Sequence, residues 1–343
     1  MKILVIQGPL FSEGISGDSP PKGQQRGTVG HITAWDSSTS MRQTLDGWVH
    51  SIDRVVIATW KSEQPKALAL QEEFQNIVPT FLAFADELYS QAVSARIMTK
   101  REYAAVRQAA TTLAGIIEAT PNASDYIFKV RTDQYVPNFV SSAIDIWSTH
   151  GDNLLLVPRI VPQQPNHFSD FYYAGRADLL AEFCRVQLER TPMAPDTHRS
   201  QFGAAVYANA KVLGRSLPIK KFLLLFPGVF GVSGQKRRRA LSAIAWTTLS
   251  PLDSSIWKGT VWRGVAFGKE REGMASVFRE EWAGSLMEPL PLFLPAAQNV
   301  MRWLRFTLRR GFMFALLNQF LEDALLRLGS CVGSIRKLRI GKH

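Results

Sequence analysis

The stretch Asp125–Val136, DYIFKVRTDQYV, joins an apolar segment to a group of charged side chains. The apolar and aromatic residues of Tyr126–Val130 predict a buried strand. This strand runs directly into Arg131-Thr132-Asp133, which places a carboxylate beside cationic side chains at its carboxyl end. Ligands bind at the carboxyl ends of strands in α/β sheets, so we expect a functional site here.

The segments on either side of this stretch alternate between strand and helix patterns. Lys2–Gln7 and Asp53–Trp60 predict core strands, and the Ala-rich stripe from Glu102 to Ala119 predicts a helix. Further expectations are a helix at Thr39–Val49, a strand at Phe81–Phe84, a helix from Pro137 to about Trp147, a strand at Asn153–Val157 and a polar loop at Ser12–Gly30. This alternation predicts an α/β fold with a mostly parallel central sheet over about residues 1–230.

Common enzyme motifs are missing from the sequence. It contains no GxGxxG after the first strand, no GxxxxGK[ST], no HExxH and no GxSxG. The usual dinucleotide sites, P-loop sites, zinc proteases and α/β-hydrolases are therefore unsupported. The two cysteines, Cys184 and Cys331, stand far apart, which fits a reducing compartment and argues against a structural zinc site.

The net charge of +11 favours anionic partners. Three groups of basic residues lie in the C-terminal region 231–343, whereas the rest of the chain is closer to balanced in charge. The groups are Lys236–Arg239, then Arg302, Arg305, Arg309 and Arg310, then Arg336–Lys342. Large apolar residues interrupt these groups, which favours an anionic membrane surface and argues against nucleic acid as the partner.

A helix expected from about Ala297 to Leu328 has a basic side and an aromatic-rich apolar side. It either lies on a membrane surface or packs its apolar side on the rest of the protein. No apolar run reaches the ~18 residues of a membrane span, and the N-terminus does not resemble a signal peptide. We therefore expect a cytoplasmic protein, with peripheral attachment to the inner membrane as an option.

The chemistry expected around Asp133 follows from its neighbours. Transfer of a sugar from a nucleotide-sugar requires neutralisation of the diphosphate leaving group. A divalent metal (Mn²⁺ or Mg²⁺) held by Asp133 can do this, and so can the cations Lys129 and Arg131. A turn-forming or helix-capping role for Asp133 is the alternative.

The segment KVRTDQ resembles the K-[IV]-R-[ST]-D element of the WavE lipopolysaccharide-synthesis family. Other stretches match this family in order over about residues 1–210: ILVIQGP at the first strand, VVIATWKSE at the second, the pair Arg107-Gln108, and FSDFYYAGRADLL at Phe168–Leu180. The resemblance implies a GT-A-like, Rossmann-like nucleotide-sugar-binding domain followed by a basic, helix-rich C-terminal extension. It also implies a glycosyltransferase acting on lipopolysaccharide or another cell-surface glycan, often lipid-linked. Arg131 stands where a standard DxD motif has its first Asp, which leaves metal dependence open.

Candidate site residues follow from the motifs and the resemblance together. The catalytic candidates are Asp133 and Asp170, the latter as general base. The nucleotide-sugar-binding candidates are Gly8, Trp60, Arg107, Gln108, Lys129, Arg131 and Asp133, and Asp133 is also the candidate metal ligand. Ordinary alternatives are a turn glycine at Gly8, a core position for Trp60 and a solvated Arg107. Asp196 and His198 are expected in a surface loop.

Two other functions compete with catalysis. The net charge is compatible with a non-catalytic binder of anionic surfaces or nucleic acid, which would not need Asp133. The missing first Asp also permits a degenerate transferase that acts as a scaffold.

Overall fold

The computed structural model of the chain describes residues 1–15, 32–85, 100–158, 160–161, 164–168, 171–189, 197–214, 244–245, 247–252, 256, 259–263 and 265–266. Its centre is a seven-stranded sheet in the order β12-β8-β11-β6-β1-β4-β5. The strands are β1 (Lys2–Gln7), β4 (Arg54–Trp60), β5 (Thr80–Ala85), β6 (Tyr126–Arg131), β8 (Leu155–Val157), β11 (Tyr173–Arg176) and β12 (Leu249–Pro251). All neighbouring pairs are parallel except those made by β11, which runs antiparallel to both β6 and β8. The predicted α/β fold with a mostly parallel sheet is confirmed.

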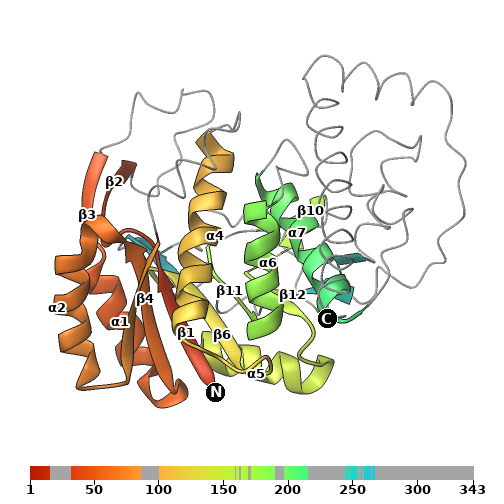
Figure 1. Cartoon of the computed structure of the whole chain (residues 1–343), viewed down its shortest axis with the longest axis horizontal. Coiled ribbons are helices and arrows are strands. Elements are labelled where there is room, and N and C mark those ends of the chain that lie inside the picture. Colours follow the sequence, from red (N-terminus) through yellow and green to blue (C-terminus); the bar gives the residue numbers. More distant parts are fainter. Residues whose placement is uncertain are drawn as a thin grey trace, which may run out of the picture. The chain divides into compact units, whose positions relative to one another are not determined.

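Helices cover both faces of this sheet (Figure 1). On one face lie α1 (Ser38–Trp48), α2 (Gln64–Gln75) and α5 (Phe139–His150), whose apolar sides join Leu4, Ile6, Phe128 and Val130 in one core. On the other face α4 (Lys100–Glu118) and α6 (Ala177–Glu189) pack side by side, and α7 (Thr197–Val212) packs against α6. Gly115 of α4 lies so close to the sheet that a Cβ atom there would be 2.7 Å from Cγ1 of Val5.

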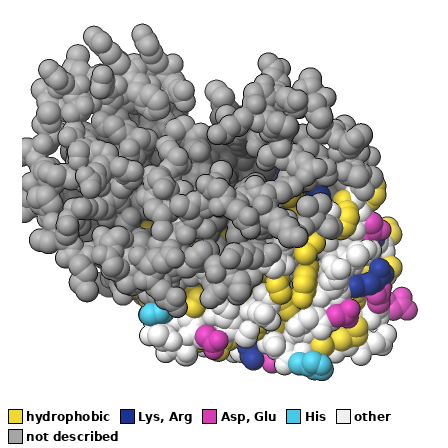
Figure 2. Space-filling model, turned by 180° about the vertical axis from the view of Figure 1, so that it is seen from behind, with side chains coloured by type: hydrophobic (Ala, Val, Ile, Leu, Met, Phe, Trp, Pro, Cys, Tyr) yellow, Lys and Arg dark blue, Asp and Glu magenta, His cyan; other side chains and the backbone are white. Residues whose placement is uncertain are grey.

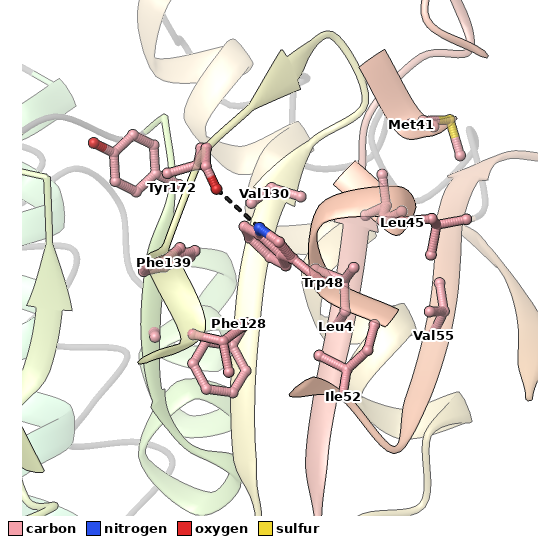
Figure 3. Packing of buried hydrophobic residues seen from close by; sticks show 14 of the residues in the cluster. Leu4, Met41, Leu45, Trp48, Ile52, Val55, Phe128, Val130, Phe139 and Tyr172 are labelled. Atoms are coloured by element: carbon pink, nitrogen blue, oxygen red, sulfur yellow. Dashed lines mark hydrogen bonds between the residues drawn. The ribbon is translucent and has the colours of Figure 1, made fainter. Parts of the chain in front are cut away.

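Aromatic rings fill the core beneath α1 and α5 (Figure 3). The rings of Trp48 and Phe128 each pack against Phe139, with centroids 5.5 and 5.7 Å away. The indole N–H of Trp48 is buried and donates to the carbonyl of Val136, at 3.0 Å. Because this carbonyl follows the R-x-D element by three residues, the core also holds the segment that carries the candidate site.

Smaller sheets surround the main one. They are formed by β2 (Phe11–Ile15) with β3 (Ile32–Asp36), by β9 (Ile160–Val161) with β10 (Gln164–Phe168), and by β7 (Gln134–Tyr135), β13 (Val261–Trp262) and β14 (Val265–Ala266). Single 3₁₀ turns occur at Val49–Ser51 and Lys61–Glu63. The polar loop expected from Ser12 therefore begins with strand residues, because Phe11–Ile15 find a pairing partner in β3.

Residues beyond 230 take part in this fold. β12 extends the main sheet by pairing with β8, and β13 pairs with β7. The folded domain therefore includes residues up to at least Ala266. The expected helix from Ala297 to Leu328 and the three basic groups lie outside the described residues.

The described surface carries mixed charge. On the face shown in Figure 2, acidic and basic side chains lie among apolar ones over the described part. Within that part of the chain, no helix is both long enough and apolar enough to cross a membrane.

Candidate active site

The R-x-D element lies where the strand order changes direction. From β1 the chain builds outward through β4 to β5 and then returns to the other side of β1 with β6. At the carboxyl ends of β1 and β6, Gln7 and Arg131 are paired across the two strands. In open α/β sheets, ligands bind outside the carboxyl ends at such a switch point. The predicted site therefore occupies the position that the topology favours for a ligand.

A tight turn after β1 closes against the R-x-D element. The backbone N–H of Thr132 donates to the carbonyl of Gln7 at 3.0 Å, and its hydroxyl donates to the carbonyl of Pro9 at 2.6 Å. Gly8 has φ +134°, and a Cβ atom there would lie 3.0 Å from the Thr132 hydroxyl oxygen. Glycine is thus required by the turn itself, and a role of Gly8 in nucleotide binding stays a prediction.

The carboxylate of Asp133 is buried and surrounded by donors. Its side chain is only 5% exposed. Oδ1 accepts from Nε of Arg131 at 3.0 Å, and Oδ2 accepts from Nη2 of Arg131 at 3.0 Å. Oδ2 also accepts from Nε of Arg263 and Nε1 of Trp262, both at 2.9 Å. Four hydrogen bonds, three of them from guanidinium groups, therefore fix this carboxylate.

Trp262 and Arg263 reach Asp133 through backbone pairing. β13 runs antiparallel to β7, and the N–H of Arg263 donates to the carbonyl of Asp133 at 2.9 Å. The same segment packs closely on the domain, since a Cβ atom on Gly259 would lie 2.6 Å from Cγ of Pro137. These two residues were not predicted from the sequence. In the sequence they stand in the triplet Trp-Arg-Gly at 262–264, which lies beyond the stretch that resembles the WavE family.

The charge state of Asp133 follows from this environment. Burial is the largest influence and raises its pKa, but the charges and hydrogen bonds of Arg131 and Arg263 together lower it by more. The pKa therefore lies below its ordinary value, and the group is a carboxylate at neutral pH. Such a group is a weak base, so Asp133 is better suited to orient the guanidiniums than to accept a proton from a sugar acceptor.

A divalent metal does not fit the residues around Asp133. Each of its oxygens already faces a guanidinium, and a metal ion bound to the same oxygens would be repelled by two neighbouring cations. In the described segments, no three His, Cys, Asp or Glu side chains gather as a potential metal site.

Arg107 and Trp60 come together from α4 and β4. The guanidinium carbon of Arg107 lies 4.4 Å from the ring centroid of Trp60, within the range of a cation–π contact. Trp60 is only 5% exposed, which agrees with a core position for most of its ring. Gln108 is half-buried on the same helix. Both Arg107 and Gln108 therefore belong to the α4 face of the sheet, near the carboxyl end of β4.

Lys129 points into the protein. Its side chain is fully buried, its ammonium donates to the carbonyl of Phe171 at 3.2 Å, and it lies 4.6 Å from the ring centroid of Tyr173. These contacts tie β6 to the segment around β11. Its expected contact with a nucleotide-sugar stays a prediction.

Asp170 and Asp196 lie outside the described residues. His198 lies in the first turn of α7, where a loop was expected. α7 begins after Pro195, so no proline interrupts its interior.

Comparisons with known proteins show little overall similarity. The chain matches no protein-family model, and no curated protein is significantly similar to it in sequence. Among solved structures it is similar to 4-diphosphocytidyl-2C-methyl-D-erythritol synthase from Anaerococcus prevotii, with 11% identity and a TM-score of 0.33 over 63% of this chain and 84% of that one. It is also similar to mouse xyloside xylosyltransferase 1, with 8% identity and a TM-score of 0.30 over 52% and 69% of the two chains. At these levels the function has to be derived from the site itself.

Proposed function

We propose that this protein is a glycosyltransferase that moves a sugar from a nucleotide-sugar donor to a lipopolysaccharide or other cell-surface glycan. The observation that carries the proposal is the position of the R-x-D element at the switch point between β1 and β6. An anionic ligand at this edge would meet Arg131 and Arg263, which are already oriented by Asp133. Fixed cations of this kind stabilise the negative charge that develops on a departing diphosphate.

The resemblance to the WavE family supports the choice of reaction and acceptor. It rests on several short motifs in order, among them Q-G after β1, T-W at the end of β4 and R-T-D after β6. Each of these three motifs falls at the carboxyl end of a parallel strand. Under this proposal, Asp170 is the candidate general base and Arg107 a candidate phosphate ligand.

Two measurements test the proposal. A panel of UDP-, GDP-, CDP- and TDP-sugars is expected to contain at least one that raises the melting temperature by mass action. That donor is then expected to release its nucleoside diphosphate faster when a lipopolysaccharide core oligosaccharide is added. Arg42, exposed on α1 and paired with Glu73, provides a control, because Arg42→Gln removes one cation without touching the site. No stabilisation by any donor, together with salt-sensitive binding to polyanions, would favour the non-catalytic alternative.

We also propose that the basic C-terminal region holds the enzyme at an anionic membrane surface, where a lipid-linked acceptor is found. The support is the sequence pattern from Ala297 to Leu328, which has arginines on one side and an aromatic-rich apolar side opposite, with Phe306 and Met313 as exceptions on the basic side. Each basic group near acidic lipid contributes about 1 kcal/mol of binding free energy. Flotation with phosphatidylglycerol-containing liposomes at low salt is expected to recover the full chain but not a variant truncated before Pro295. Failure of both forms to float would mean that the helix belongs to the fold.

A further inference from the structure

We propose that Glu63 is a positioning residue for donor binding: its carboxylate holds the turn after β1, Gly8–Phe11, in the conformation that a nucleotide-sugar meets at the switch point. Glu63 ends the 3₁₀ turn Lys61–Glu63, which directly follows β4. The role in donor binding rests on the proposed function, whereas the contacts of Glu63 with the turn are those of the structure.

Both oxygens of the Glu63 carboxylate bind groups near the carboxyl ends of β1 and β4. Oε1 accepts from the backbone N–H groups of Leu10 at 2.8 Å and of Phe11 at 3.2 Å. Oε2 accepts from the hydroxyl of Thr59, the last residue but one of β4. Hydrogen bonds to a carboxylate are stronger than those to a neutral acceptor. Glu63 therefore ties the turn after β1 to the end of the neighbouring strand.

Two other segments hold the carbonyl groups of the same turn. From the R-x-D element, the Thr132 hydroxyl donates to the carbonyl of Pro9 at 2.6 Å. Ser37, directly before α1, donates its hydroxyl to the same carbonyl at 3.2 Å and its backbone N–H to the carbonyl of Leu10 at 3.0 Å. The turn is thus fixed from three sides. A surface that is rigid before a ligand arrives loses less conformational entropy on binding.

The backbone N–H groups of this turn are all engaged within the protein. Gly8 donates to the carbonyl of Ala58 at 3.1 Å, and the proline that follows has no N–H. The next two residues donate to Glu63. Loops that bind phosphate do so with backbone N–H groups that point at the ligand. A phosphate would have to displace the Glu63 carboxylate, which also repels it. The contribution of Glu63 is therefore to fix the shape of the turn and not to free its N–H groups for phosphate.

The experiment measures the dissociation constants of UDP, GDP, CDP and TDP by titration calorimetry on the full-length protein, with and without Mg²⁺. The diphosphate that binds the unaltered protein most tightly is the probe for the variants. Glu63→Ala is expected to weaken its binding roughly 10- to 100-fold, because the charged hydrogen bonds that hold the turn are lost. Glu63→Gln keeps an oxygen acceptor for both N–H groups and is expected to retain most of the affinity.

Glu73→Ala is the matched control. Glu73 lies on α2, the helix that follows Glu63, and pairs with the exposed Arg42 at 2.6 Å. Its removal takes away a carboxylate without touching the turn, so the variant is expected to bind the probe as the unaltered protein does. Circular dichroism melts establish that each variant is folded at the temperature of the titration.

Hydrogen exchange followed by mass spectrometry checks the structural step. In Glu63→Ala, peptides that cover Gly8–Phe11 are expected to exchange faster, because two of their amides lose their acceptor, while peptides from β6 keep their protection. Unchanged exchange in the turn would mean that Glu63 does not hold it.

The sign of the change in affinity separates positioning from its alternatives. If the turn were a phosphate loop masked by Glu63, Glu63→Ala would free two N–H groups and bind the probe more tightly, which would overturn the proposal. A lower melting temperature with an unchanged dissociation constant would make Glu63 a purely structural residue and would overturn it too. Sugar transfer can still stand in both cases. If no nucleoside diphosphate binds the unaltered protein, the proposed function itself fails, and the role of Glu63 in donor binding fails with it.

Discussion

The Nε atom of Arg263 lies 2.9 Å from Oδ2 of Asp133, 130 residues earlier in the chain. The backbone N–H of Arg263 also donates to the backbone carbonyl of Asp133, at 2.9 Å. Side chain and backbone of Arg263 together fix the residue that follows β13 against the turn that follows β6. The R-x-D element is therefore completed by a residue from a distant part of the sequence.

The buried Asp133 is expected to make stability depend on pH. Its pKa is lowered in the folded protein, so its contribution is fully present above the unfolded pKa of about 3.9 and is lost as pH falls through the lower folded value. Asp133→Asn should cost about 3–5 kcal/mol at pH 7, because it removes the buried carboxylate that pairs with both guanidiniums. Urea unfolding at pH 7, 5 and 3.5 should show this difference shrink below pH 4. Asp145→Asn, at an exposed position on α5, is the control for removal of a carboxylate away from the site.

Gly8→Ala is expected to destabilise the protein through both its backbone and a steric contact. Gly8 has φ +134°, and the new Cβ would lie 3.0 Å from the Thr132 hydroxyl. Gly151→Ala is a matched control, because Gly151 also has a positive φ of +85° but has nothing within 4 Å of its Cβ position. We expect Gly151→Ala to cost about 1 kcal/mol and Gly8→Ala about 1–3 kcal/mol more, measured by denaturant unfolding. Equal costs would mean that the turn accommodates the contact with Thr132.

Gly115→Ala is expected to be destabilising although alanine favours helices. The substitution gains about 1 kcal/mol of helix propensity. Its Cβ would nevertheless lie 2.7 Å from Cγ1 of Val5 and 3.0 Å from Cβ of Ala58, in the tightly packed contact of α4 with the sheet. Overpacking of this kind typically costs about 1–3 kcal/mol.

Gly47→Ala, on α1, is the comparison for Gly115→Ala on α4. Its Cβ would meet only the ring edge and hydroxyl of Tyr135, at 3.2 Å. A side chain shifts more readily than two packed strands, so Gly47→Ala should change the melting temperature less than Gly115→Ala. The opposite order would show that the α4 contact is the looser of the two.

The thiol of Cys184 is expected to be unreactive in the folded protein. It is fully buried, and burial raises its pKa to about 12, so almost no thiolate is present at neutral pH. In a Cys331→Ser variant, Ellman's reagent should label no thiol until denaturant is added and one thiol afterwards. Rapid labelling under native conditions would mean that the contact between α6 and the sheet opens frequently.

The core strands could be predicted because their signals are local. Lys2–Gln7, Asp53–Trp60 and Tyr126–Val130 are short apolar runs, and they correspond to β1, β4 and β6. Local patterns do not determine strand direction. The antiparallel orientation of β11 follows from how the chain returns between β6 and β8, which no single segment encodes.

The candidate site was only partly predictable for the same reason. Arg131 and Asp133 stand two residues apart at the end of one strand, so their proximity follows from the sequence. The contacts of Asp133 with Trp262 and Arg263 depend on pairing between β7 and β13, two strands of only two residues each. Such short strands carry no periodic signal, and their pairing is decided by the packing around them.

The pairing of β13 with β7 also determines when the site can form during protein synthesis. Because Arg263 and Trp262 are translated long after Asp133, a growing chain exposes the R-x-D element before its later partners have left the ribosome. Domains fold from the N-terminus as the chain emerges, so β1, β4 and β6 can assemble first. The contacts around Asp133 are then completed only once residues near 263 are released, and shorter nascent chains lack Trp262 and Arg263.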